Sequence, residues 1–161
     1  MRKITGILLF LGLTVCAAMA QVEHRGEVFA GYQYTHLDGG TDANGWNAGL
    51  TGNFSDWLGL RADFSGAYKS GFHFYTYTFG PEISVHLPVV KPFVHALFGA
   101  ATASGGGSST TGFDMMFGGG VDAGHGRLAW RVVQADWMVT RFSGFTDKNN
   151  VRVGTGLVFR F

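Results

Sequence analysis

Six histidines and eleven acidic residues are the side chains of this sequence best suited to acid–base or nucleophilic chemistry. Nucleophilic hydrolysis needs a serine, a histidine base and an orienting acid within hydrogen-bonding distance of one another. His36 or His73 could form such a group beside Ser70 and Asp38. His125 stands in a Gly-His-Gly turn and has no serine beside it. Polar loop residues of this kind are usually solvated, so we expect no enzyme, and an envelope-lipid acyltransferase or deacylase is the alternative.

Patterns for metals and cofactors are missing from the sequence. There is no H-E-x-x-H pair and no EF-hand spacing, and the single cysteine, Cys16, lies in the first twenty residues. The glycine run Gly105-Gly106-Gly107 lacks the lysine and helix that complete a phosphate-binding loop. A net charge of +1 gives no electrostatic case for nucleic acid. We expect no metal, no cofactor and no nucleic-acid partner.

Charged residues of both signs recur on the polar side of segments in which polar and apolar side chains alternate. They are Glu27, Arg61, Asp63, Glu82, Asp122, Asp136, Arg152 and Arg160. Buried charges must pair and form hydrogen bonds, so an interior charge network is the expected arrangement, with Arg152 neutralising a carboxylate such as Glu27. A narrow, gated ion path is the alternative, because ionisable groups inside membrane proteins often mark function.

The first twenty residues have the pattern of a secretory signal peptide. Two basic residues precede the apolar run Ile4–Val15, and Ala18-Met19-Ala20 is a small-x-small cleavage site. We expect residues 1–20 to be removed and residues 21–161 to form a single domain that is exported without cysteine. Lipidation of Cys16 is the alternative, although the preceding valine fits a lipidation signal poorly.

After this segment, no stretch approaches the ~18 apolar residues of a transmembrane helix. The other structure that crosses lipid is a closed β-barrel, because every backbone group must be bonded internally. Alternation with a period of two is therefore the deciding pattern. It is clearest in the last segment, whose apolar face is Val151, Val153, Thr155, Leu157, Phe159 and Phe161. The opposite face carries Arg152 and Arg160 among glycines, as in a strand with lipid on one side and a lumen on the other.

Seven further segments alternate in the same way, which predicts about eight antiparallel strands. A change of parity within 128–142 predicts a β-bulge near Val132-Val133. Phe93 and Leu97 fall on the otherwise polar side of their segment. Connections near residues 55–56, 87–91 and 124–127 are expected to be short. Those at 38–44, 67–71, 103–111 and 143–150 are expected to be longer loops, which would place both termini on the periplasmic side.

The mature chain resembles the small OmpA-type outer-membrane β-barrel domain family. The resemblance rests on the alternating strands and on the ending Gly156-Leu157-Val158-Phe159-Arg160-Phe161. It implies that Phe161, Phe159 and Leu157 form the signal read by the barrel-assembly machinery. We expect no peptidoglycan-binding domain after Phe161, which is a departure from larger proteins of this type.

The sequence thus predicts an all-β fold, a closed antiparallel up-and-down transmembrane barrel of about eight strands in the bacterial outer membrane. The expected function is a structural or surface-interaction role, with outer-membrane lipid as partner and no open pore, because eight strands enclose little more than side chains. A soluble, lipocalin-type barrel is a further alternative, and it would point the apolar faces inward. We expect arginine at Leu60 or Leu157 to be costly in the lipid and Thr155→Val to be mild.

Overall fold

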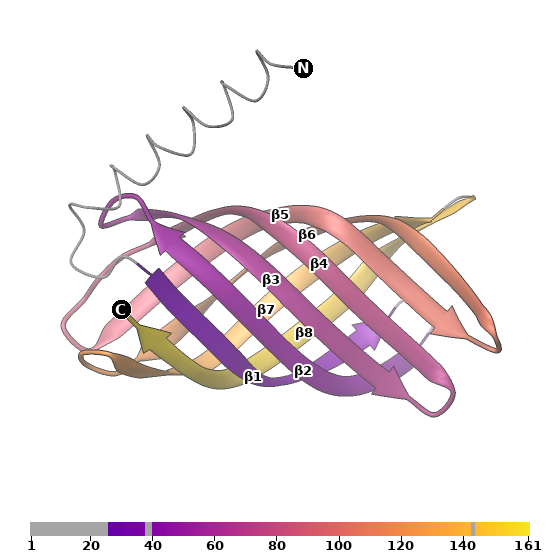
Figure 1. Cartoon of the computed structure of the whole chain (residues 1–161), viewed down its shortest axis with the longest axis horizontal. Coiled ribbons are helices and arrows are strands. Elements are labelled where there is room, and N and C mark those ends of the chain that lie inside the picture. The colour runs from indigo at the N-terminus through magenta and orange to yellow at the C-terminus, as the bar shows by residue number, and fades with distance from the viewer. Residues whose placement is uncertain (1–25, 38–39, 143) are drawn as a thin grey trace, which may run out of the picture.

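The computed structural model describes residues 26–37, 40–142 and 144–161, which form a closed barrel of antiparallel strands (Figure 1). The strands are β1 (Gly26–Leu37), β2 (Thr41–Asn53), β3 (Leu58–Lys69), β4 (Phe72–Ser84), β5 (Val90–Gly105), β6 (Ser108–Ala123), β7 (Leu128–Phe142) and β8 (Phe145–Arg160). The predicted fold class and the eight strands are confirmed. Within the described residues no helix is long and apolar enough to cross a membrane. The signal peptide predicted at residues 1–20 lies outside this part of the chain.

Each strand pairs with its neighbours in sequence, and β1 closes the barrel against β8 from Glu27↔Arg160 to His36↔Val151. Gly26 and Phe161 exchange backbone hydrogen bonds of 3.0 and 2.9 Å, so the first and last described residues lie together at one end. We call this the terminal end. The opposite end, where β1 meets β2 and β5 meets β6, is the hairpin end.

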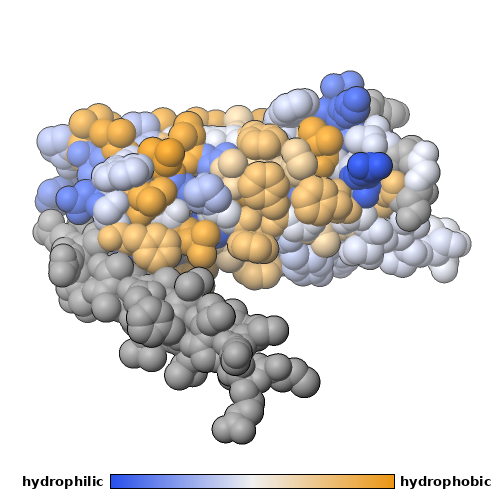
Figure 2. All heavy atoms as spheres, turned by 90° about the horizontal axis from the view of Figure 1, so that it is seen from above, coloured by the Kyte–Doolittle hydropathy of each residue, from blue (hydrophilic) through white to orange (hydrophobic). Residues whose placement is uncertain are grey.

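The apolar faces of the strands point outward. On β8, Leu157 and Phe159 are 59% and 49% exposed, whereas Arg152 and Arg160 are 1% and 7% exposed. Figure 2 shows hydrophobic side chains from the terminal part to the middle of the visible face, with hydrophilic ones at the terminal rim and at the hairpin end. A soluble barrel would bury these apolar faces, so the lipocalin-type alternative is wrong.

The predicted β-bulge is confirmed on β7. Asp122 of β6 pairs with Arg131 while Val121 pairs with Val133, so Val132 is the extra residue. The pairing of β7 with β8 shifts at the same place, between Arg131 and Gln134. The bulge places both valines on the outer surface and returns Gln134 to the lumen.

The prediction of four longer loops is wrong, whereas the connections predicted to be short are short, and 124–127 has the predicted bounds. The strands run through most of the four segments expected to be long loops, leaving only residues 38–40, 70–71, 106–107 and 143–144 between them. The connections at the terminal end, 54–57, 85–89 and 124–127, are longer. Ser, Thr and Asn side chains do not prevent the backbone from pairing, so the polar composition of these segments did not mark the ends of the strands.

The lumen also contains apolar side chains. Phe93 and Leu97, which fall on the polar side of their segment, are buried inside the barrel. Toward the hairpin end the lumen holds a buried apolar cluster. Its members are Leu37, Ala43, Ala67, Phe74, Leu97, Ala101, Met116, Met138 and Phe142. The inner surface is therefore polar in its middle and apolar near the hairpins.

Candidate functional site

All eight charged residues that the sequence singles out lie buried on the inner side of the barrel: Glu27, Arg61, Asp63, Glu82, Asp122, Asp136, Arg152 and Arg160. Five further polar residues, which the prediction omitted, join them there: Lys91, His95, Asp114, Arg131 and Gln134. His95 and Asp114 stand on the polar side of their alternating segments. Lys91 was assigned to a turn, and Arg131 lies next to the bulge, so alternation alone did not identify these two.

Arg152 and Arg61 connect strands from opposite parts of the barrel. Arg152 on β8 donates from Nη1 to Asp63 Oδ1 on β3 at 2.8 Å and from Nε to Asp136 Oδ2 on β7 at 2.8 Å. Arg61 donates to Asp63 Oδ2 at 2.9 Å and to Glu82 Oε2 at 3.1 Å. Asp63 therefore accepts from two guanidinium groups.

Arg131 lies between two aromatic rings. Its guanidinium carbon is 4.3 Å from the ring centre of Phe29 and 4.2 Å from that of Phe93, within the range of cation–π attraction. The same group donates to both carboxylate oxygens of Asp122, at 2.7 and 3.0 Å. Phe93 thus lies on the polar side of its strand because it packs against a cation.

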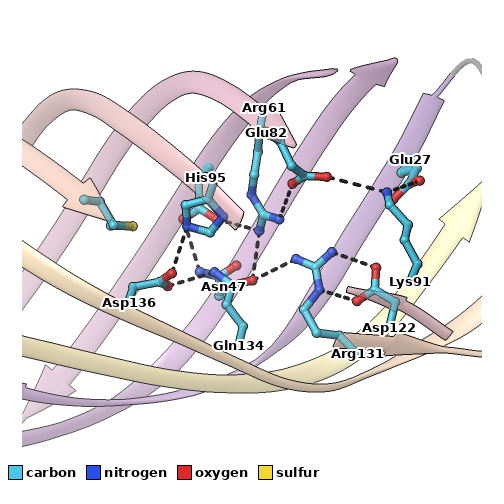
Figure 3. Close-up of polar contacts among 12 residues, drawn as sticks. Glu27, Asn47, Arg61, Glu82, Lys91, His95, Asp122, Arg131, Gln134 and Asp136 are labelled. Atoms are coloured by element: carbon cyan, nitrogen blue, oxygen red, sulfur yellow. Dashed lines mark hydrogen bonds and ion pairs between the residues drawn. The ribbon is translucent and has the colours of Figure 1, made fainter. Parts of the chain in front are cut away.

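Gln134 connects the ion pairs of Arg61 to those of Arg131 (Figure 3). Its Oε1 accepts from Arg61 at 3.1 Å and from Arg131 at 2.7 Å. Its Nε2 donates to Asp136 Oδ2 at 2.8 Å. This neutral side chain is held in place by the bulge, which turns it into the lumen.

The predicted partner of Arg152 is wrong. Glu27 interacts instead with Lys91, whose Nζ lies 2.5 Å from Glu27 Oε1 and 3.5 Å from Glu82 Oε1. Arg160 lies farther from Glu27, at 3.8 Å. Neighbouring positions on adjacent strands do not determine which charged side chains form ion pairs. A long side chain in a narrow lumen reaches strands across the barrel.

His95 is a buried histidine that lies beside Asp136 in the lumen. Its Nε2 lies 2.8 Å from Asp136 Oδ1, and its Nδ1 has no hydrogen-bond partner among the described residues. Asp114 accepts a 2.8 Å hydrogen bond from Thr140 on the next strand. A histidine–carboxylate pair can share a proton, but no serine in the described part of the chain is hydrogen-bonded to a histidine.

Gly118 makes room for this pair. A Cβ atom at Gly118 would lie 2.1 Å from Asp136 Oδ1 and 2.5 Å from the carbonyl oxygen of Ala135. A side chain there would displace the carboxylate that binds His95 and Arg152. The glycine therefore belongs to the site although it carries no side chain.

The hydrolytic group considered from the sequence lies partly outside the described residues, and the two histidines named for it have other neighbours within them. His36 Nδ1 lies 2.6 Å from Asp42 Oδ1, and His73 packs its ring against Tyr68. Asp38 lies outside the described residues. Within the ranges that the structure describes, no group of three or more His, Cys, Asp or Glu side chains is arranged to hold a metal ion.

The C-terminal residues implicated in assembly lie on the outer surface. Leu157, Phe159 and Phe161 are exposed, and the rings of the two phenylalanines stack with centres 6.5 Å apart. Phe161 also pairs with Gly26 at the seam between the first and last strands.

Comparison with known proteins gives the fold. No protein-family model matches this chain, and no curated protein matches it. Among solved structures it is similar to Neisserial surface protein A, with 17% identity over 84% of this chain and 96% of that one and a TM-score of 0.64. The N-terminal β-barrel domain of Pseudomonas aeruginosa OprF shares 13% identity over 86% of this chain and 98% of that one, with a TM-score of 0.59.

Ail, the attachment invasion locus protein of Yersinia pestis, was solved in complex with the heparin analogue sucrose octasulfate. That structure shares 18% identity with this chain over 86% of it and 100% of Ail, with a TM-score of 0.52. The closed barrel and its eight strands agree with these structures. The chain therefore has the fold of the small eight-stranded outer-membrane β-barrels.

Proposed function

We propose that this protein is an integral outer-membrane barrel with a filled lumen and no open pore, serving envelope structure or interaction at the cell surface. The observation that carries this proposal is the sequence of contacts across the lumen. Ion pairs link β3, β4, β7 and β8 through Arg61 and Arg152. The apolar cluster follows on the hairpin side. An ion crossing the barrel would have to break buried pairs and then enter an apolar region, and both steps are costly.

The outer membrane is the proposed location because the exposed face is apolar and the fold is that of outer-membrane barrels. Both ends of the barrel chain lie at the terminal end. We assign this end to the periplasm because the strands continue past the apolar band at the hairpin end, where the outward positions of β1 and β2 are polar. The proposed assembly signal, Leu157, Phe159 and Phe161, would then remain accessible to the barrel-assembly machinery on the side from which the chain arrives. The paired hairpins would extend toward the outside and offer a surface for partners.

Conductance in a planar bilayer tests the filled lumen. The unmodified protein, shown to be folded by heat-modifiable gel mobility and recovered in the outer-membrane fraction, should conduct no ions or very few. An open, ion-selective pore that Arg152→Ala abolishes would replace this proposal with a channel. Recovery in the soluble periplasmic fraction would remove the membrane location as well.

Enzymatic activity is not part of the proposed function. The surface dyad of His36 and Asp42 has Tyr34 as its hydroxyl neighbour, with Tyr34 Oη donating to Asp42 Oδ1 at 2.7 Å. Its outward position at the hairpin end would place it on the side of outer-leaflet lipid. Acyl-transfer and deacylation assays on envelope lipid should show no turnover. Turnover that His36→Ala abolishes would favour the enzyme.

A further inference from the structure

A cavity of about 570 Å³ opens at the terminal end of the barrel. Its walls are the three connections of that end, including Asp56 and Trp57, Ser84 to Pro88, and Gly124 to Gly126. Arg160, from the last strand, is a lining residue whose side chain comes from the lumen. The cavity therefore joins the mouth of the lumen to the outer rim, where Trp57, Val85 and Leu87 are exposed.

Arg160 is a buried cation whose hydrogen bonds are incomplete. Its side chain is 8% exposed, and neither Nε nor Nη2 has a hydrogen-bond partner among the described residues. The nearest carboxylate oxygens, Glu27 Oε1 and Asp122 Oδ2, are 3.8 and 4.0 Å away and belong to groups that bind Lys91 and Arg131 more closely. Buried guanidinium donors are rarely left without acceptors. Nε and Nη2 are covered, so an oxyanion in the cavity would reach this group through Nη1, the guanidinium nitrogen that is not among the buried atoms.

Two histidines in the walls are held through Nδ1, and their Nε2 atoms have no hydrogen-bond partner among the described residues. His86 Nδ1 lies 2.7 Å from the carbonyl oxygen of Asp56, and His125 Nδ1 lies 3.3 Å from that of Pro88. A carbonyl oxygen only accepts, so each Nδ1 carries the proton. In a neutral imidazole the other nitrogen, Nε2, is then a hydrogen-bond acceptor. The cavity therefore offers guanidinium donors and imidazole acceptors together.

We propose that this cavity binds a phosphate that also carries hydroxyl groups, that is, a polyol phosphate such as glycerol phosphate. The phosphate oxygens would accept from Arg160, and the hydroxyl groups would donate to Nε2 of His86 and His125. The same chemistry occurs in free glycerol phosphate and in the headgroup of phosphatidylglycerol. In the lipid case Trp57, Val85 and Leu87 would lie beside the acyl chains at the rim.

Calorimetric titration of the folded protein in phosphatidylcholine nanodiscs tests the site. Glycerol phosphate is the ligand, and sulfate is the matched anion without hydroxyl groups at neutral pH. Glycerol phosphate should bind more tightly than sulfate, and Arg160→Gln should weaken both by about tenfold or more. His125→Phe keeps an aromatic ring but removes the acceptor, so it should weaken glycerol phosphate by about threefold and leave sulfate unchanged.

Arg127→Gln is the control, because it removes the same charge at the same end from a residue outside the cavity lining. It should change neither affinity by more than about twofold. If Arg160→Gln fails to fold, Arg160→Lys keeps the charge without the forked donors and should still weaken both anions. Absence of glycerol phosphate binding, binding that is insensitive to both Arg160 variants, or equal affinity for sulfate would overturn the proposal.

Mixed-lipid nanodiscs distinguish the two sources of the ligand. Enrichment of phosphatidylglycerol around the unmodified protein, measured by lipid mass spectrometry and lost in Arg160→Gln, identifies a lipid headgroup. Binding of glycerol phosphate without such enrichment identifies a soluble ligand. Either result supports a polyol-phosphate site and leaves the filled-lumen proposal to its own conductance test.

Discussion

Trp130 and Thr155 form a hydrogen-bonded pair on the outer surface of the barrel, beside the β-bulge of β7. Trp130 Nε1 donates to Thr155 Oγ1 at 2.9 Å, and the same hydroxyl donates to the carbonyl oxygen of Arg131 at 2.8 Å. The pairing of β7 with β8 shifts here, between Arg131, which pairs with Gly156, and Gln134, which pairs with Gly154. Thr155 therefore supplies a backbone partner where the strand pairing is interrupted, in a position where lipid offers none.

Thr155→Val should accordingly be destabilising and not mild, as the apolar face alone suggested. It leaves an indole N–H without its acceptor and a carbonyl without this donor, for a cost of about 1–3 kcal/mol. The free energy of unfolding in urea, measured in phospholipid vesicles, gives this cost. Thr155→Ser keeps the hydroxyl and should recover most of the loss. Equal stability of the valine variant and the unmodified protein would contradict the role given to this hydroxyl.

Arginine on the lipid-facing side tests which surface contacts the membrane. Leu60 and Leu157 are 46% and 59% exposed on the outer face. Leu60→Arg or Leu157→Arg should cost about 2–4 kcal/mol if the position lies near the bilayer midplane. Leu87→Arg is the matched control, because Leu87 is equally outward but lies in the 85–89 connection at the rim, where arginine should cost about 0–1 kcal/mol. Vesicle unfolding measures all three, and equal costs would refute the assignment of a lipid-facing band.

The surface pair of Asp42 and His36 predicts a local pH dependence at the hairpin end. The outward residues between Tyr34 of β1 and Trp46 of β2 are polar: His36, Asp42 and Asn44. The pair of Asp42 and His36 therefore lies beyond the apolar band of the outer surface. The hydrogen bond from His36, followed by that from Tyr34, lowers the pKa of Asp42 below its ordinary value. A carboxylate with a lowered folded-state pKa contributes stability above its unfolded pKa and loses it as the pH falls through the folded pKa.

NMR titration of the Asp42 carboxyl group in nanodiscs measures that pKa directly. His36→Ala should raise the pKa of Asp42 toward the ordinary value, because it removes the larger of the two hydrogen bonds. His73→Ala is the control, since His73 packs on Tyr68 and not on Asp42. The pair would have no electrostatic effect if the Asp42 titration were the same in all three proteins.

The sequence predicted the strands and the inner surface well because lipid imposes alternation on every spanning strand. Arg61, Asp136 and Arg152 were placed correctly for this reason, and the parity change located the bulge beside Val132. Alternation does not encode where pairing stops, so the hairpin segments were mistaken for loops. It also treats the lumen as uniformly polar, which left Phe93 and Leu97 unexplained. Their positions follow from packing against Arg131 and within the apolar cluster.

Contacts across the lumen were the least predictable feature. Asp63 and Arg152 are 89 positions apart in sequence and lie on strands that are not neighbours in the barrel. Which inward residues share a level depends on the tilt and stagger of the strands, and no single strand carries that information. The Glu27 partner expected for Arg152 was chosen by strand adjacency, and adjacency was the wrong criterion.

A double-mutant cycle distinguishes the partner of Arg152 by energy. Arg152→Ala leaves Asp63 and Asp136 as buried carboxylates with fewer partners, and it should cost about 3–5 kcal/mol. Asp63→Ala combined with Arg152→Ala should show a coupling energy of about 0.5–3 kcal/mol, because the two groups are hydrogen-bonded. Glu27→Ala combined with Arg152→Ala should be additive within about 0.5 kcal/mol, because Glu27 binds Lys91. Vesicle unfolding supplies each free energy, and stronger coupling of Arg152 to Glu27 than to Asp63 would contradict the observed pairing.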